Sequence, residues 1–286
     1  MTQTTLHLVP GTPRIACDLA GDGPLVIFMH GIGGNRSNWR ANLPAFARHF
    51  ACVAWDARGY GDSDDYETEL AFDDFVADLL RVQDHLGVRR AHLVGLSMGG
   101  RIAMRCALLH PDRVATLTLL DTHEGFEAFS PQQRLAFVDS RRAPLLGGKE
   151  PRDIAEPVAR TLVSSSAKPE HLQQLIDSIA ALHKESYIKS LQATVEQVTL
   201  GDISTIRAPA HFVVGSEDTL TPVAMHREMA AKLGGAPVTV LPGARHLSNI
   251  EAADAFNAAA MAWLLPRAEL AQRPSNWHAA SASRIG

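Results

Sequence analysis

The chain has 286 residues and a formal net charge of −4, a length that suits one large α/β domain carrying an insertion. The balanced charge argues against a nucleic-acid partner, because no basic stripe is available to neutralise phosphates. The N-terminus lacks the basic and apolar regions of a signal peptide, and no apolar run approaches the ~20 residues of a membrane span, so we expect a soluble cytoplasmic protein without a membrane partner.

Short apolar runs along the chain predict β-strands. The first two, TLHLV and RIACDLA, flank a Gly11-Thr12-Pro13 turn and indicate an opening hairpin. Most of the later runs are continuously apolar instead of alternating, which is typical of strands buried on both faces of a parallel sheet. These runs are residues 25–30, 51–56, 91–96, 114–121, 210–218 and 237–243.

Helical patterns separate these strands. The pattern over residues 72–87 has one apolar stripe and stops at Gly87, and the pattern over 100–110 stops before Pro111. Towards the C-terminus, Thr221 is the expected N-cap of a helix, and Ser248 with Glu251 has the spacing of a capping box. The alternation predicts an α/β fold with a mainly parallel, doubly wound sheet.

The alternation stops between residues 123 and 205, where helical patterns occur without a convincing strand. Ser130 and Gln133 form a capping box there, LLGGKEPRD is read as a turn, and residues 171–183 and 186–198 are amphipathic. We therefore expect a core of residues 1–122 and 206–266, a helical cap of residues 123–205, and a C-terminal surface extension of residues 267–286.

Ser97 lies between Gly95 and Gly99 at the end of the strand predicted for residues 91–96. The sequence G-L-S-M-G fits G-x-S-x-G, a strand-turn-helix elbow that exposes a strained serine. Five residues match easily by chance, and a serine that only caps a helix is the alternative. The apolar strand before Ser97 and the helix after it favour a nucleophile, with Met98 N–H as one oxyanion donor.

A nucleophilic serine needs a base, and His246 is the predicted one. It follows the last strand and precedes the last helix, so it should lie at the same sheet edge as Ser97. His30 also ends a strand, but the glycines after it point to a backbone role, and His92 begins its strand at the far edge. Packing or surface roles are expected for the histidines within helical patterns, which are His110, His171 and His183.

The base needs an orienting acid, and Asp218 is the predicted one. It ends the strand before the helix that starts near Thr221, and it is better placed to reach the histidine than its neighbour Glu217. Asp121 is the competitor, because it ends the strand after the elbow helix.

The segment HGIGGN (residues 30–35) is the predicted second half of an oxyanion hole. Ile32 N–H is the expected donor beside Met98 N–H, with Gly33 as the alternative, and Gly31 and Trp39 are expected to contact substrate. A glycine-rich turn without further function is the other reading. The segment has neither G-x-G-x-x-G nor P-loop spacing, and the chain has no HExxH motif. Metal and disulfide chemistry are not expected of Cys17, Cys52 and Cys106, which are far apart and read as buried free thiols, so no cofactor is predicted.

From Leu25 to Leu265 the chain resembles the α/β-hydrolase superfamily. The resemblance rests on HGIGG, WDARGYGDSD, GLSMGG, HPDRVATLTLLDT, GSEDTLTP and GARHLSNIE, and it implies the triad order Ser97, Asp218, His246. The segments VVGSEDTLTP and GARHLSNIEAADAFN look most similar to the 3-oxoadipate enol-lactonase group and its esterase relatives. Haloalkane dehalogenases are excluded, since they have aspartate at the position of Ser97.

We therefore expect a serine hydrolase that cleaves a small carboxylic ester or lactone through an acyl-enzyme. Carbon–carbon hydrolases resemble the chain less, because Ile32-Gly33-Gly34-Asn35 and Leu247 replace their Ser-Gly-Pro-Gly loop and tryptophan. Cofactor-free perhydrolases, a non-catalytic ligand-binding member and a homo-oligomer are left open. Arg141 and Arg142 could meet a substrate carboxylate, but a solvated charged face is the preferred reading.

Overall fold

The computed structural model describes residues 4–127, 129–277 and 280. Within these residues, eight strands form one sheet in the order β1-β2-β4-β3-β5-β6-β7-β8. The strands are β1 (Thr5–Val9), β2 (Ile15–Ala20), β3 (Leu25–Met29), β4 (Ala51–Trp55), β5 (Ala91–Leu96), β6 (Val114–Leu120), β7 (Ala210–Gly215) and β8 (Val238–Leu241). The first two form the predicted antiparallel hairpin, and β3 to β8 pair in parallel. The predicted α/β fold with a mainly parallel sheet is confirmed.

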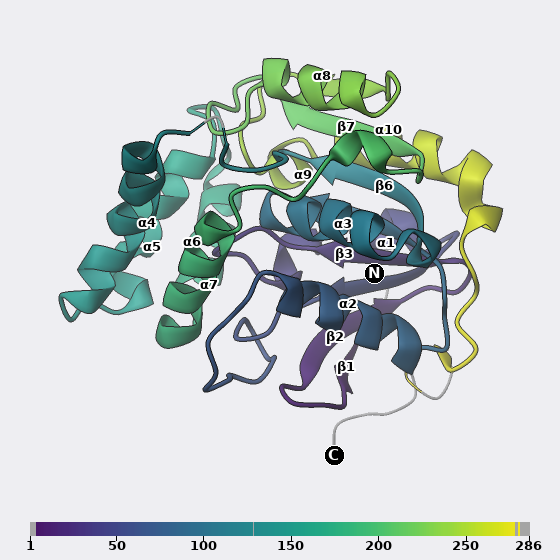
Figure 1. Ribbon diagram of the computed structural model, residues 1–286, viewed down its shortest axis with the longest axis horizontal. Helices are drawn as coiled ribbons and strands as arrows, with labels where there is room; N and C mark the ends of the chain where they lie inside the picture. Colours follow the sequence, from purple (N-terminus) through teal and green to yellow (C-terminus); the bar gives the residue numbers. More distant parts are fainter. Residues whose placement is uncertain (1–3, 128, 278–279, 281–286) are drawn as a thin grey trace.

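The central strands have the burial that their composition predicts. Every residue of β3, β4, β5 and β6 is buried, and β5 contributes only apolar side chains, His92 and one glycine. Helices shield the sheet, as Figure 1 shows. They are α1 (Leu43–Phe46), α2 (Asp73–His85), α3 (Met98–Leu109), α8 (Val223–Lys232), α9 (Ser248–Glu251) and α10 (Ala253–Leu264), together with the 3-10 turns η1 (Arg36–Trp39), η2 (Pro111–Arg113), η3 (Ile203–Thr205) and η4 (Leu265–Leu270).

The interval without predicted strands forms a group of helices on one side of the sheet, at the left of Figure 1. These helices are α4 (Pro131–Leu146), α5 (Pro151–Leu162), α6 (Pro169–Ala180) and α7 (Lys184–Glu196), which we call the cap. Helix α4 begins with the predicted capping box of Ser130 and Gln133. Helix α5 was not predicted from the sequence, because Pro157 lies inside that helix and proline usually ends one. Ala128, in the chain leading into the cap, lies outside the described residues.

The C-terminal segment after η4 packs on the core, on the side facing away from the cap. Leu25 N donates to Gln272 O (2.9 Å) and Gln272 N donates to Arg90 O (2.9 Å), so the segment crosses the amino ends of β3 and β5. Trp277 is 4% exposed, and its Nε1 donates to Gly21 O (2.8 Å). The expectation of a mere surface extension missed this anchor, since a single tryptophan gives no helical or strand periodicity. Residues 278–279 and 281–286 of that extension lie outside the described residues.

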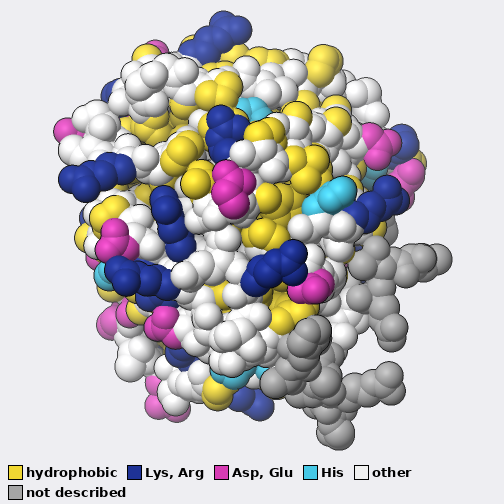
Figure 2. All heavy atoms as spheres, turned by 90° about the vertical axis from the view of Figure 1, so that its right-hand side faces the viewer, with side chains coloured by type: hydrophobic (Ala, Val, Ile, Leu, Met, Phe, Trp, Pro, Cys, Tyr) yellow, Lys and Arg dark blue, Asp and Glu magenta, His cyan; other side chains and the backbone are white. Residues whose placement is uncertain are grey.

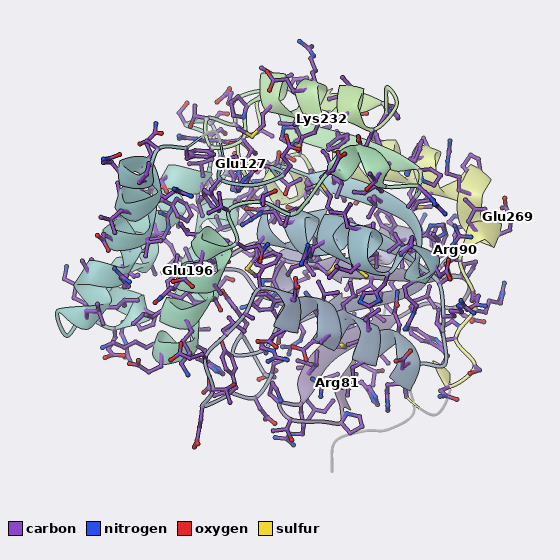
Figure 3. All side chains as sticks on the ribbon, viewed as in Figure 1. Arg81, Arg90, Glu127, Glu196, Lys232 and Glu269 are labelled. Carbon is purple, nitrogen blue, oxygen red and sulfur yellow. The ribbon has the colours of Figure 1, made fainter. Side chains whose placement is uncertain are left out.

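The side that carries the C-terminal segment is shown in Figure 2, where basic and acidic side chains are interspersed among apolar ones. Figure 3 labels Arg90 and Glu269 on this side of the molecule. All three cysteines are buried and unpaired. In the described part of the chain, no helix is long and apolar enough to cross a membrane.

Candidate active site

Ser97 occupies a strained turn between β5 and α3. Its backbone angles are φ 52° and ψ −111°, in a region that residues with a side chain rarely adopt. The turn is tight enough to require glycine on both sides. A Cβ on Gly95 would lie 2.3 Å from Gly99 O, and one on Gly99 would lie 2.2 Å from Met29 O. The structure thus shows the elbow geometry predicted from G-x-S-x-G, with Ser97 at the wall of a cavity.

His246 lies in the loop between β8 and α9 and contacts Ser97. Its Nε2 is 3.0 Å from Ser97 Oγ, and its Nδ1 is 2.8 Å from Asp218 Oδ2. The backbone N–H of His246 donates to Leu162 O (3.1 Å) at the end of cap helix α5. Three side chains from separate loops therefore form one hydrogen-bonded chain, in the order that the sequence analysis expected.

Asp218 is held as an ionised carboxylate behind the histidine. Its Oδ1 accepts from Leu220 N (2.8 Å) and Thr221 N (3.0 Å), and its Oδ2 accepts from Thr221 Oγ1 (2.6 Å) and His246 Nδ1. Burial opposes ionisation, but the charge of His246 and these hydrogen bonds outweigh it and lower the pKa of Asp218 to about 2. The acid is therefore charged at neutral pH and fixes the tautomer of the imidazole.

Thr221 is a site residue that the sequence analysis misassigned. The expected N-cap role is wrong, because α8 begins at Val223 with Pro222 in the capping position. The hydroxyl of Thr221 instead donates to Asp218. A threonine three residues after an aspartate at a strand end was the available signal, since such side chains often bond back to a nearby acid or backbone group in a turn.

The pKa of His246 reflects several opposing effects. Burial lowers it, whereas the charges of Asp218 and Asp121 and the hydrogen bond to Asp218 raise it, and the net pKa lies above its usual value. Arg141 acts in the opposite direction, because its positive charge disfavours the imidazolium. The histidine is thus surrounded by groups that stabilise its charged form, with one cation that limits the effect.

Asp121, the competing acid, does not contact the imidazole through any described hydrogen bond. It is fully buried with φ 43°, and its carboxylate accepts from Gly215 N (2.9 Å), Ser248 N (3.0 Å) and Ser248 Oγ (2.7 Å). Burial and the nearby charge of Asp218 raise the pKa of Asp121. Asp121 thus ties together the loops that carry Asp218 and His246, while Glu217 is exposed.

The predicted capping box of Ser248 and Glu251 is wrong. Ser248 donates to Asp121 instead of capping a helix, and the C-terminal helical pattern is split into α9 and α10. The carboxylate of Glu251 accepts from Arg245 N (3.0 Å) and from Ser164 N (2.8 Å) in the cap. The Glu251 carboxylate therefore connects the loop that carries His246 to the cap.

The glycine-rich loop after β3 lies against Ser97. A Cβ on Gly31 would be 3.1 Å from Ser97 Cβ, and Gly31, Ile32 and Gly33 line the cavity. The His30 side chain fixes the start of this loop through two hydrogen bonds. Ala57 N donates to His30 Nε2 (3.0 Å), so Nδ1 carries the proton and donates to Gly31 O (2.8 Å). This arrangement places the segment around Ile32 beside Ser97. Met98, the other expected oxyanion donor, directly follows Ser97 as the first residue of α3.

Trp39 does not contact the cavity, so its predicted role in substrate binding is wrong. It is fully buried, and its ring centroid is 5.2 Å from that of Phe28 and 6.0 Å from that of Phe256. Closeness in sequence to the glycine-rich loop did not reveal that η1 turns this large apolar side chain into the core. Gly31, the other predicted substrate contact, does line the cavity.

The cavity above Ser97 has a volume of about 450 Å³ and lies between the sheet edge and the cap. Its cap side is mainly apolar and includes Phe126, Phe129, Phe137, Val158, Leu162 and Leu175. A wall of this kind can accommodate the apolar parts of a small ligand.

Arg141 lines the same cavity and adds a guanidinium to a lining whose other polar members include His123, Gln133 and Ser178. Its guanidinium carbon lies 4.3 Å from the Phe137 ring centroid, and Nη1 donates to Phe137 O and Ser140 Oγ (both 3.1 Å). Among the residues that the structure describes, no carboxylate lies within ion-pair distance of Arg141. The preferred reading of a solvated face is wrong for Arg141, whereas Arg142 forms a helical ion pair with Asp139 (2.8 Å).

Comparisons with known proteins agree with this architecture. A family model described as alpha/beta hydrolase fold matches residues 24–253. The chain is 30% identical over 268 residues to a protein named as a carbamate hydrolase, RutD, from Caulobacter sp. (strain K31), covering 90% of this chain and 94% of that one. It is 32% identical over 251 residues to the dihydrolipoyllysine-residue acetyltransferase component of an acetoin cleaving system from Pseudomonas putida, covering 86% of this chain but only 65% of that protein.

Solved structures show the same likeness. A thermophilic esterase from Thermogutta terrifontis superimposes with a TM-score of 0.83 at 25% identity, covering 93% of this chain and 99% of that one. The enol-lactonase from Burkholderia xenovorans LB400 gives 0.81 at 25% identity, with 89% and 98% covered. The match of the family model over most of the chain, together with the parallel sheet and its cap, shows that this protein belongs to the α/β-hydrolase family.

Proposed function

We propose that the protein is a serine hydrolase that cleaves a small carboxylic ester or lactone through an acyl-enzyme intermediate. The observation that carries this proposal is the hydrogen-bonded chain from Ser97 Oγ through His246 to Asp218 at the floor of an apolar cavity. This combination of nucleophile, base and orienting acid is the one that acyl transfer requires.

In the proposed mechanism, Ser97 Oγ attacks the substrate carbonyl while His246 Nε2 takes its proton. Asp218 keeps the Nδ1 proton in place and stabilises the imidazolium as it forms. The backbone N–H groups of Ile32 and Met98 stabilise the negative oxygen of the tetrahedral intermediate. The imidazolium then protonates the leaving alkoxide. His246 next takes a proton from a water molecule, whose oxygen attacks the acyl carbon, and the imidazolium returns the proton to Ser97 Oγ as the acid leaves.

Arg141 narrows the proposed substrate class. An unpaired guanidinium in an apolar cavity gains most from an anionic partner, and it can bind a carboxylate through two parallel hydrogen bonds. We therefore propose that the acyl part of the substrate carries a carboxylate. Likeness to an enol-lactonase and an esterase supports ester or lactone cleavage, and likeness to the protein named as a carbamate hydrolase makes carbamates the control class to assay beside them.

The proposal is tested by comparing wild type with Ser97→Ala on a panel of p-nitrophenyl esters, lactones and carbamates. We expect Ser97→Ala to lose turnover by roughly four orders of magnitude or more. A fluorophosphonate probe should label wild type but not Ser97→Ala. Ser204→Ala changes a serine remote from the triad and is the matched control, which should keep both activity and labelling. Unchanged ester hydrolysis by Ser97→Ala, or no labelling of wild type, would contradict the proposal.

A further inference from the structure

A row of three side chains runs along the helix that follows the nucleophile candidate. Ser97, Arg101 and Arg105 are spaced four residues apart, so they lie on one face of α3. Arg101 N donates to Ser97 O (3.1 Å), which places the first arginine one turn below the elbow. Any group that Arg101 holds is therefore positioned by the same helix that positions Ser97.

Arg101 is fully buried and binds the end of the last cap helix. Its Nη1 donates to Thr194 O (2.6 Å) and its Nη2 donates to Gln197 O, in and after the final turn of α7. Figure 3 labels Glu196, the last residue of α7, and so marks this helix end. Terminal carbonyls lack partners within the helix and carry partial negative charge, so they suit a cation.

This helix end replaces the carboxylate that a buried arginine normally has. In the described ranges, no acidic side chain lies within ion-pair distance of Arg101. Burial lowers the pKa of its guanidinium to about 9, so the group is still charged at neutral pH. A buried cation whose main compensation comes from cap carbonyls constrains the position of the cap strongly.

Two aromatic rings pack against the Arg101 guanidinium. Its carbon lies 4.9 Å from the ring centroids of both Phe72, in the core, and Phe126, in the cavity wall. Phe126 N also donates to Val198 O (2.7 Å). Arg101 therefore joins three parts of the molecule: the elbow helix, the wall of the cavity and the chain that leaves the cap.

Arg105 provides a natural comparison within the same row. Its Nη1 donates to Leu200 O (3.0 Å), so it also holds the chain that leaves the cap. However, Arg105 is paired with Asp73 (2.7 Å), and it contacts neither the cavity nor an aromatic ring of its wall in the described structure. Its loss should weaken the attachment of the cap without moving Phe126.

We propose that Arg101 is a positioning residue that sets the distance between the cap wall at Phe126 and Ser97, and so determines which acyl groups fit. This proposal rests on the proposed function, in that Ser97 is taken as the nucleophile. Acyl groups too short to reach the cap wall should be insensitive to Arg101, whereas longer ones should depend on it. The role is one of geometry, because the guanidinium is buried behind Phe126 and does not contact the reacting atoms.

The test compares Arg101→Met, Arg101→Lys and Arg105→Met on p-nitrophenyl acetate and p-nitrophenyl hexanoate. Concentrations of active enzyme are set by fluorophosphonate titration. For Arg101→Met we expect KM for the hexanoate to rise ~10-fold or more, with kcat for the acetate changed by less than about threefold. Arg101→Lys should recover part of the hexanoate KM, because lysine keeps a cation that can reach one carbonyl. Arg105→Met should leave the ratio of the two KM values unchanged.

Phe126→Leu provides a second route if Arg101→Met does not fold. It leaves the cation and its carbonyl partners in place, and it should also raise KM for the hexanoate selectively. Equal loss on both esters in Arg101→Met, or an unchanged ratio of KM values in Phe126→Leu, would overturn the proposal. That result differs from failure of the proposed function, in which wild type itself would neither be labelled nor hydrolyse either ester.

Discussion

The sheet edge and the cap meet at one cavity but differ in how their polar groups are satisfied. At the sheet edge, the Asp218 carboxylate accepts four hydrogen bonds and Asp121 accepts three. On the cap side, aromatic and aliphatic side chains predominate, and the Arg141 cation has no acidic partner among the described residues. The polar groups of the first region are satisfied within the protein, whereas under the proposed function Arg141 gains its anionic partner from the substrate. We therefore infer that the core determines the type of reaction and that the cap determines the choice of substrate.

The largest expected effect is a difference in kcat between variants of the two aspartates at the sheet edge, Asp218 and Asp121. We expect Asp218→Asn to lower kcat by about 10⁴-fold, because an amide favours the wrong imidazole tautomer and cannot stabilise the imidazolium. Asp121→Asn keeps the shape of the side chain and should lower kcat far less, while reducing the melting temperature. Steady-state kinetics on p-nitrophenyl acetate and thermal unfolding of both variants measure this. Equal losses of kcat in the two variants would mean that the acids share the role.

The C-terminal anchor should affect stability without affecting chemistry. Trp277→Ala should lower the free energy of unfolding by ~3–5 kcal/mol, the usual range for removing a buried aromatic side chain. Because Trp277 lies at the amino ends of the strands, kcat of the folded variant should remain close to wild type. Trp277→Phe is the control, since it keeps most of the packing and loses only the hydrogen bond to Gly21 O. Urea unfolding with activity assays in the absence of urea measures both quantities, and a stable Trp277→Ala would show that the anchor contributes little.

Arg141 should affect substrates according to their charge. Loss of its hydrogen bonds to a carboxylate should cost ~1.5–3 kcal/mol, which is roughly 10- to 100-fold in kcat/KM. We therefore expect Arg141→Gln to lower kcat/KM for a hemisuccinate ester by that factor and to spare the matching neutral butyrate ester. Arg142→Gln, next to it but paired with Asp139, should change neither. An equal effect of Arg141→Gln on both esters would contradict the proposal that the substrate carries a carboxylate.

The smallest effect expected is a change in pH dependence. His246 must be neutral to accept a proton, so kcat/KM should rise as the pH passes its pKa, which lies above the usual value. The charge of Arg141 lowers this pKa, so its removal stabilises the imidazolium and raises the pKa. The acid limb of the pH profile for a neutral ester should therefore move to higher pH in Arg141→Gln and stay in place in Arg142→Gln. A shift to lower pH would contradict the electrostatic arrangement described here.

The core could be predicted from the sequence because its signals are local. A continuously apolar run predicts a buried strand, and the residue after it lies at a known edge of the sheet, which is why Ser97, Asp218 and His246 could be selected without coordinates. The cap offered no comparable rule. Helix α5 was hidden by Pro157, and the directions of Trp39 and Arg141 depend on packing against segments distant in sequence. Ser248 was assigned to a helix cap because its acidic partner, Asp121, is distant in sequence, whereas Thr221 bonds to the nearby Asp218 and its spacing was a local signal that the helix-cap assignment overlooked.

The hydrogen bond from His246 N to Leu162 O ties the backbone of the proposed general base to the end of cap helix α5. Helix α5 cannot move away from the sheet without either breaking this bond or pulling the backbone of the histidine with it. The position of α5 and the alignment of the imidazole are therefore coupled through this bond and through the contact of Glu251 with Ser164 N. Leu162 also lines the cavity, so under the proposed function an acyl group packed against it contacts the residue whose carbonyl holds the backbone of the proton acceptor.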